Sequence, residues 1–233
     1  MRKTGSCNAP HLLPVWLRFT ELNMKIALPI ATAFSLVPVG ANAHPHIFVN
    51  TGLTVIISTA GQLEAVEITW AYDEFYSLLI FEDLALDADF DGELTQQELD
   101  KLQGFDLQWS EGYEGDSYLT SNGVKLALGA GEHLLTEVSN GQITTRHRRE
   151  LAQPVSADGV VFRAYDPTYY TAYTLNQGLE VSGDCKGEIT PPDLNAAYSM
   201  VEELLYSMPA SQTNDAYPEV GEAFADVVRL SCE

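Results

Sequence analysis

The acidic stretch from Asp87 to Glu98 places the tightest constraint on the local fold of this chain. Its sequence, DADFDGELTQQE, matches the calcium-loop pattern D-x-[DN]-x-[DN]-G-x5-E at every constrained position. Such a loop joins two helices, and its ligands would be Asp87, Asp89, Asp91, Glu93, Thr95 and Glu98. Gly92 stands at the sharp turn of the loop, where a positive φ favours glycine. The alternative is a solvated acidic turn in front of a helix.

The beginning of the chain has the pattern of a secretory signal peptide. Lys25 is followed by an apolar run over residues 26–39 and by small residues that end at Ala43. These are the basic region, the apolar region and the cleavage site of such a signal. We therefore expect residues 1–43 to be a signal peptide, with Met24 as an alternative start, and residues 44–233 to form one periplasmic domain. The run is too short to anchor the protein, and we expect no transmembrane segment in the mature chain.

The charge of the chain excludes one class of partner. It carries 33 acidic and 12 basic side chains, a formal net charge of −21. Binding to nucleic acid needs a basic surface that neutralises phosphates, and no stretch of the sequence offers one. Hydrophobic residues make up 45% of the chain, which is enough for a packed core. We therefore expect a folded protein whose partners are cations or basic surfaces.

Cleavage after Ala43 leaves two cysteines, Cys185 and Cys232, in the mature chain. Two cysteines in an exported protein predict one disulfide, because the periplasm is oxidising. The alternative is a pair of free thiols.

Hydrophobic periodicity predicts mostly strands, with helices around the acidic loop and near the carboxyl end. We expect hairpins over 46–58 with 63–72, 118–120 with 124–128, and 132–138 with 142–151, and strands over 160–165 and 169–175. Helices are expected over 73–86, 95–102 and 191–207, and residues 221–233 form a short helix or strand. The prediction is a single α+β domain of antiparallel hairpins with an EF-hand-like helix–loop–helix and a C-terminal helix.

Signal cleavage would create a candidate transition-metal site at His44 and His46. The new α-amine and two imidazoles then lie within three residues, and nitrogen ligands of this kind suit zinc, copper, nickel and cobalt. Pro45 has no amide hydrogen, which disfavours a square-planar site built on deprotonated amides. The alternative is a frayed terminus with two solvated histidines. We favour a metal site because residues 47–49 are expected to form a strand.

Two further residues could assist such a site. His147 lies in the basic cluster Arg146 to Arg149 and, on a strand, shares a face with Ile143 and Thr145. A solvated strand with local salt bridges is one interpretation of this cluster, and a docking spot or a third imidazole is the other. Asp166 could shape a turn before Pro167 or orient a metal-bound histidine. The sequence lacks the common motifs of nucleophilic and nucleotide-dependent enzymes, so we expect no catalytic residues and no enzyme activity.

Three segments of the mature chain carry a resemblance to a known family. They are HPHIFV from His44, WAYDEFYS from Trp70 and YDPTYY from Tyr165. Together they resemble the bacterial DUF1007 family, whose members are described as periplasmic components of uncharacterised transport systems. The resemblance implies handling of divalent first-row metals beside a nickel/cobalt-type transporter in the inner membrane. It places His44, His46, Asp73 and Asp166 at family motif positions.

The sequence therefore predicts a periplasmic metal-binding accessory protein of a zinc or nickel/cobalt transport system. Its cofactors would be Ca²⁺ and a transition metal, Zn²⁺ or Ni²⁺/Co²⁺, and its partner an inner-membrane metal transporter. One alternative is a calcium-dependent protein-interaction module without a transition metal. Another is a copper enzyme in which His44 forms a histidine brace.

Overall fold

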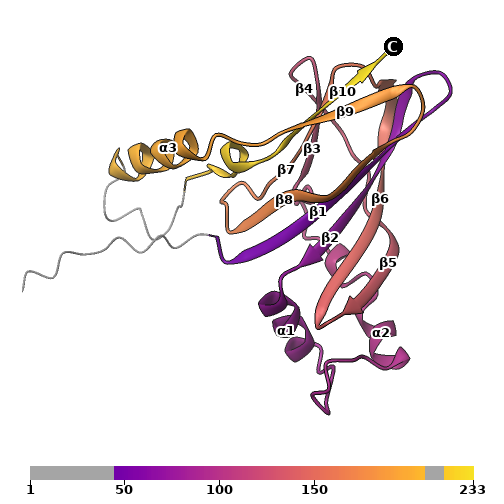
Figure 1. Ribbon diagram of the computed structural model, residues 1–233, viewed down its shortest axis with the longest axis vertical. Helices are drawn as coiled ribbons and strands as arrows, with labels where there is room; N and C mark the ends of the chain where they lie inside the picture. Colours follow the sequence, from indigo (N-terminus) through magenta and orange to yellow (C-terminus); the bar gives the residue numbers. More distant parts are fainter. Residues whose placement is uncertain (1–44, 208–217) are drawn as a thin grey trace, which may run out of the picture. The chain divides into compact units, whose positions relative to one another are not determined.

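A computed structural model describes residues 45–207 and 218–233 of the chain (Figure 1). The predicted signal peptide and His44 lie outside these residues. The described part is a mixed α+β domain with two five-stranded sheets. The α+β class predicted from the sequence is thereby confirmed.

The first sheet has the strand order β5-β6-β2-β1-β8. Its strands are β1 (Ile47–Ile57), β2 (Gln62–Tyr72), β5 (Glu132–Ser139), β6 (Gln142–Ser156) and β8 (Thr171–Val181). Two predicted hairpins, β1–β2 and β5–β6, supply four of these strands, and β2 pairs with β6 in antiparallel fashion. The fifth strand, β8, lies parallel to β1, with Ile47 opposite Thr171. This parallel pairing was not predicted.

The second sheet has the order β4-β3-β7-β10-β9. Its strands are β3 (Ser117–Ser121), β4 (Val124–Leu126), β7 (Val160–Ala164), β9 (Cys185–Thr190) and β10 (Val227–Cys232). The predicted hairpin of β3 and β4 is present, and its Asn122-Gly123 turn has the positive φ angles that such a turn requires. Strand β9 was not predicted. It follows β8 of the first sheet after a turn at Gly183, and it pairs with β10 within the second sheet.

Side chains from both sheets form one hydrophobic cluster. Strand β1 contributes alternate residues such as Val49, Leu53 and Val55, and the second sheet contributes residues such as Leu119 and Phe162. The alternation follows from the two-residue period of a strand, which turns every second side chain toward the same face. The sheets therefore bury their inner faces against each other.

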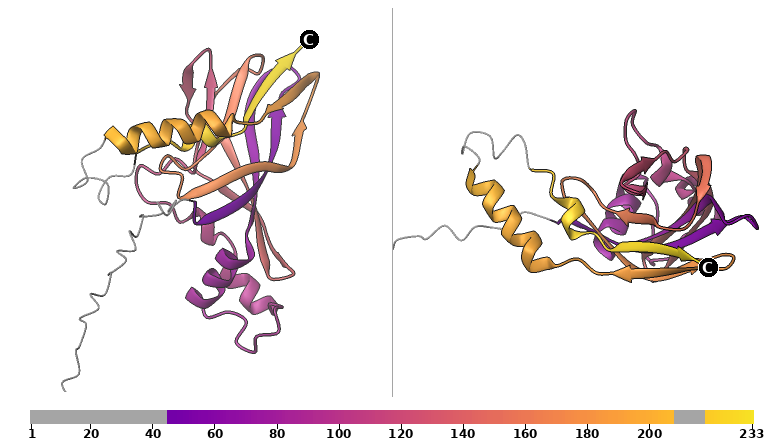
Figure 2. Two further views of the ribbon diagram at one scale, coloured as in Figure 1. Left: turned by 60° about the vertical axis from the view of Figure 1, so that its left-hand side comes forward. Right: turned by 90° about the horizontal axis from the view of Figure 1, so that it is seen from above.

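The helices lie outside these layers. Helices α1 (Glu74–Asp83) and α2 (Gln96–Leu102) lie near each other beyond one end of the strands, while α3 (Leu194–Ser207) extends to one side (Figures 1 and 2). Helix α1 is shorter than predicted because Ala85 adopts a φ of 50°, which a helix cannot continue. The carboxyl end, predicted as a short helix or a strand, contains the 3₁₀ turn η2 (Gly221–Phe224) followed by β10. No helix of the described residues has the length and apolarity needed to cross a membrane.

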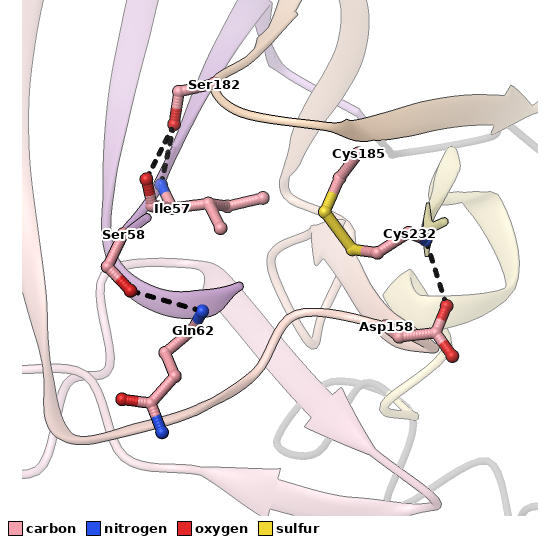
Figure 3. Close-up of a disulfide and its surroundings, with 7 residues drawn as sticks. All are labelled: Ile57, Ser58, Gln62, Asp158, Ser182, Cys185 and Cys232. Atoms are coloured by element: carbon pink, nitrogen blue, oxygen red, sulfur yellow. Dashed lines mark hydrogen bonds between the residues drawn. A yellow bond between two sulfur atoms is a disulfide. The ribbon is translucent and has the colours of Figure 1, made fainter. Parts of the chain in front are cut away.

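The predicted disulfide joins the ends of two neighbouring strands. Cys185 begins β9 and Cys232 ends β10, and the two residues are partners in the strand register. Figure 3 shows the bridge beside Ile57, at the far end of β1 from His46. The backbone N–H of Cys232 also donates to the Asp158 carboxylate at 3.0 Å. The carboxyl end of the chain is thus fixed by a covalent bond and a hydrogen bond.

Candidate functional site

The beginning of β1 is fixed by the segment that precedes β8. The backbone N–H groups of His46 and Ile47 both donate to the carbonyl of Tyr170, at 2.8 and 3.3 Å. The His46 side chain is exposed, and its ring lies 4.8 Å from the Tyr170 ring. The chain is therefore anchored from residue 46 onward, two residues after the predicted cleavage site.

Asp73 attaches the end of β2 to the same place. Its Oδ2 accepts a hydrogen bond from the Phe48 N–H at 2.8 Å, and the Asp73 N–H donates to the Phe48 carbonyl at 3.0 Å. Its Oδ1 accepts from the Tyr76 N–H at 2.8 Å, which caps the amino terminus of α1. Both carboxylate oxygens thus hold backbone groups, and this arrangement favours a positioning role over metal ligation.

Asp166 shapes the turn between β7 and β8. Its Oδ1 accepts from the Thr168 N–H at 2.9 Å, and its Oδ2 accepts from the Thr171 N–H at 3.0 Å. Its carbonyl oxygen would lie 1.7 Å from a Cβ added at Gly221, so only glycine fits against this turn. Tyr169 within the turn has a φ of 59°, a strained conformation for a bulky residue. Asp166 is therefore a turn-forming residue that places Tyr170 and the start of β8.

A cavity of about 340 Å³ lies beside these three segments. Strands β1, β2 and β8, helix α1 and the connection between α2 and β3 form its wall. The residues that line it are Ile47, Val49, Trp70, Tyr72, Tyr76, Ile80, Phe105, Asp106, Tyr113, Asp116, Thr171 and Tyr173. Aromatic rings and two carboxyl groups thus dominate the lining. Tyr113 is 40% exposed, so solvent reaches the cavity.

The two carboxyl groups of the cavity differ in their hydrogen bonds. Asp116 is 6% exposed and its Oδ2 accepts a hydrogen bond from the Tyr173 hydroxyl at 2.9 Å. Burial raises the pKa of Asp116 to about 6, although hydrogen bonds from Tyr113 and Tyr173 oppose this shift. Asp106 accepts from the Thr145 hydroxyl through Oδ2 at 2.6 Å, while its buried Oδ1 has no hydrogen-bond partner among the described residues. Burial raises the pKa of Asp106 as well.

His147 lies behind the cavity wall, in the interior of the domain. It is fully buried, and its ring centroid lies 4.6 Å from that of Trp70. Within the described part of the chain, neither ring nitrogen has a hydrogen-bond partner. Burial, with a smaller contribution from Arg149, lowers its pKa to about 3. Arg149 is 4% exposed and donates to the carbonyls of Gly129 and Glu114 at 2.9 and 2.6 Å. The prediction of a solvated strand here is wrong on this face, although the predicted alternation is correct.

His46 and His147 do not come together. Leu53 of β1, Ile68 of β2 and His147 of β6 lie in one row across the sheet. His46 precedes Leu53 by seven residues, which at about 3.3 Å per residue places it roughly 23 Å along the strand. His147 therefore cannot complete a metal site at His46. The ring of His133 lies within hydrogen-bond distance of the Thr136 hydroxyl, at 2.9 Å.

The acidic loop lies between α1 and α2. Asp87, Asp89 and Asp91 have carboxylate oxygens within 4.8 Å of one another, close enough to share one cation. Glu98 is bonded to the start of the loop through the Asp87 N–H, at 3.0 Å, and it also accepts from the Thr95 N–H at 2.9 Å. These contacts bring both ends of the predicted calcium loop together.

Gly92 has a φ of 79°, as the calcium-loop pattern requires. The Gly92 N–H donates to the Asp87 carboxylate at 3.2 Å, and the Asp91 N–H donates to it at 3.0 Å. Asp87, the first residue of the loop pattern, thus holds the loop in a compact turn through these two hydrogen bonds. Oxygen donors arranged in this way suit a hard cation such as calcium.

Comparison with known proteins settles the relationship of the chain. The profile of the family described as protein of unknown function (DUF1007) matches residues 30–232. The chain belongs to the DUF1007 family. Its sequence matches none of the curated proteins.

The structure gives the three family segments of this DUF1007 protein a common location. The segments that begin at His44, Trp70 and Tyr165 are far apart in the sequence, yet they meet at the start of β1. Each of the first two contributes lining to the cavity, and the third leads directly into Thr171 and Tyr173. The cavity is therefore the feature around which these segments gather.

Sequence reasoning missed Asp106, Asp116 and Tyr113 as cavity residues. They come from the irregular connection between α2 and β3, where no periodicity indicates which side chains turn inward. One signal was available: residues 165–173 contain four tyrosines, Tyr173 among them, and buried tyrosines need hydrogen-bond partners. Asp116 is such a partner, with a φ of 44° that asparagine and aspartate tolerate better than most residues.

Proposed function

We propose that this protein is a periplasmic metal-binding accessory protein of a divalent transition-metal transport system, for zinc or nickel/cobalt. The observation that carries the proposal is the anchoring of His46 to Tyr170 in the main chain. A terminus held in this way loses little conformational freedom when it binds a metal. The α-amine and imidazole of His44 together with the imidazole of His46 would form the nitrogen site, and Asp73 and Asp166 would position it.

This part of the proposal is tested by metal titration of the exported protein, with intact mass establishing His44 as the first residue. Zinc, nickel and copper should bind, and His44→Ala and His46→Ala should each weaken binding at least tenfold, because each removes a nitrogen ligand. His133→Ala is the matched control, since His133 lies in β5 and should not affect the terminus. Unchanged affinity in both terminal variants would exclude the site.

We further propose that the acidic loop is an EF-hand-like calcium clip between α1 and α2. The carboxylates of Asp87, Asp89 and Asp91 repel one another at this separation, and a bound Ca²⁺ would relieve the repulsion. A calcium sensor commonly pairs two such loops, and the sequence offers one. The role we assign to calcium is therefore to stabilise the two helices beside the sheet.

Calcium at 10 mM should raise the melting temperature of the protein. A site with a Kd of about 10⁻⁴–10⁻³ M would add about 1.4–2.7 kcal/mol of stability, or roughly 3–10 °C. Asp89→Asn should abolish this shift without lowering the stability of the calcium-free protein, because among the described residues the Asp89 carboxylate accepts no hydrogen bond. Asp100→Asn, which removes an exposed charge from α2, should keep the full shift. An equal calcium response in Asp89→Asn and the unmodified protein would contradict the proposal.

Apolar side chains on the exposed side of α1 favour a role for this helix in binding a partner protein. Phe75, Leu78 and Leu79 are 68%, 57% and 41% exposed, and Phe90 in the acidic loop is 87% exposed. Apolar side chains of this size on a strongly acidic chain are typical of a protein-binding surface. In our proposal the partner is the inner-membrane metal transporter. The alternative function, a calcium-dependent interaction module, would use the same surface, and it predicts that calcium alone raises the melting temperature while zinc and nickel do not.

A further inference from the structure

We propose that the cavity at the start of β1 binds a small organic cation, a protonated amine or alkylammonium ion. This inference goes beyond the transition-metal site and does not depend on it. It rests on the two carboxyl groups of the cavity, on the aromatic rings that line it with them and on the cavity's size.

The cavity is lined by two carboxyl groups that no cationic side chain of the described residues pairs with. None of its lining residues is a lysine, arginine or histidine, and neither Asp106 nor Asp116 forms an ion pair within the described part of the chain. Tyrosine hydroxyls satisfy Asp116. The Oδ1 atom of Asp106 is buried and accepts no hydrogen bond from the residues that the structure describes. A buried, unpaired carboxylate oxygen is unfavourable, and a cation that donates N–H groups to it would remove this cost.

Several aromatic rings line the same cavity as Asp106. The ring centroid of Tyr72 lies 5.3 Å from that of Tyr76 and 5.7 Å from that of Phe105. Trp70 extends the group, with its centroid 5.9 Å from that of Tyr173. The faces of such rings attract organic cations by about 0.5–2 kcal/mol each, more when the cation is desolvated. Carboxyl groups and the faces of aromatic rings together recognise alkylammonium groups.

The same arrangement disfavours a bare metal ion in the cavity. Zinc and calcium need several nitrogen, sulfur or oxygen ligands that converge on one point at about 2.0–2.6 Å. Among the described residues, the acidic loop is where three carboxylates lie close enough to share an ion, and the cavity offers no such group. A volume of about 340 Å³ instead falls at the lower end of the range for small-molecule sites, roughly 300–1,000 Å³. The cavity therefore has the size of a small organic ligand.

The experiment compares charged and neutral ligands of the same shape. The protein is titrated with ethylammonium, tetramethylammonium and benzylammonium ions. Their neutral counterparts are ethanol, tert-butanol and benzyl alcohol, respectively. Binding is followed by calorimetry and by Trp fluorescence. We expect at least one ammonium ion to bind at least tenfold more tightly than its neutral partner. If no ammonium ion binds better than its counterpart, the proposal is wrong.

A variant of a cavity residue then tests whether the ammonium ion binds in the cavity. Asp106→Asn keeps the shape of the side chain and removes its charge, and it should weaken binding of the preferred ammonium ion at least tenfold. Asp184→Asn removes a charge beside Ile57, at the far end of β1, and should bind normally. Equal affinity in Asp106→Asn and the unmodified protein would overturn the assignment. Displacement of the bound ammonium ion by equimolar zinc would also overturn the assignment, because the cavity would then be a metal site. Comparison of ligands on the unmodified protein keeps the test valid if Asp106→Asn does not fold.

Discussion

Removal of the Cys185–Cys232 disulfide should lower the free energy of unfolding by about 4 kcal/mol. The two cysteines are 47 residues apart, and closing a loop of that length restricts the unfolded chain by about this amount in the chain-entropy model. The loss should be visible as a lower urea midpoint.

The measurement is urea unfolding of the oxidised protein, the reduced protein and the double variant Cys185→Ser with Cys232→Ser. The last two should lose stability equally, because both lack the covalent constraint. Asp158→Ala is the matched control. It removes the hydrogen bond to the Cys232 N–H but keeps the disulfide, and it should lose only about 1 kcal/mol. An unchanged midpoint after reduction would show that the bridge does not contribute.

Local signals made several elements of this fold predictable. The turn at Asn122-Gly123 defines a hairpin by itself, because both residues accept positive φ angles. Asp73 likewise marks the start of α1 through a hydrogen bond that spans three residues. The Asp87–Glu98 pattern predicts a compact acidic loop for the same reason. In each case the interactions that determine the structure lie within a few residues of one another.

Non-local pairings could not be predicted in this way. Strand β8 lies parallel to β1 although more than 100 residues separate them, and no residue pattern in either strand specifies that neighbour. The cavity depends on this pairing, because Thr171 and Tyr173 enter its wall through β8. Consequently the residues of the family segments were identified from the sequence, but their common location was not.

The interior of β6 shows a different limit of sequence reasoning. A period of two indicates that His147 shares a face with Thr145, but polarity suggested the wrong environment for that face. The structure instead buries His147 in contact with aromatic rings, and it buries Arg149 with its guanidinium 4.9 Å from the Trp109 ring centroid. Backbone carbonyls from two other segments compensate the arginine, and these partners cannot be located from the sequence of the strand.

His147 should make the stability of the protein strongly dependent on acid. Burial keeps its imidazole neutral and lowers its pKa from 6.5 to about 3 in the folded state. Between these values the unfolded chain binds the proton and the folded chain does not, so protonation favours unfolding as the pH falls below 6.5. The shift corresponds to about 3 kcal/mol at pH 4.5 and about 5 kcal/mol at full development. Above pH 6.5 the imidazole is neutral in both the folded and the unfolded chain, so this destabilisation is absent.

Asp116 acts in the opposite direction. Its pKa is raised from 3.8 to about 6, so the folded chain holds this proton more tightly and gains stability as the pH falls from about 6 toward 3.8. The pH dependence of the unmodified protein is therefore smaller than that of His147 alone. The unmodified protein and a His147 variant both contain Asp116. The difference between their free energies of unfolding therefore cancels the contribution of Asp116 when Asp116 and His147 titrate independently.

The test compares urea unfolding of the unmodified protein and His147→Phe at pH 7, 5.5 and 4.5. Phenylalanine keeps an aromatic ring against Trp70 and removes both unpaired ring nitrogens, so the variant should become more stable relative to the unmodified protein as the pH falls, by about 3 kcal/mol at pH 4.5. His133→Phe is the matched control, because His133 is the partner of His147 across β5 and β6 but is only partly buried. Its curve should run parallel to that of the unmodified protein. A parallel curve for His147→Phe would mean that the imidazole gains its proton without unfolding, and that its burial does not control the acid stability of the domain.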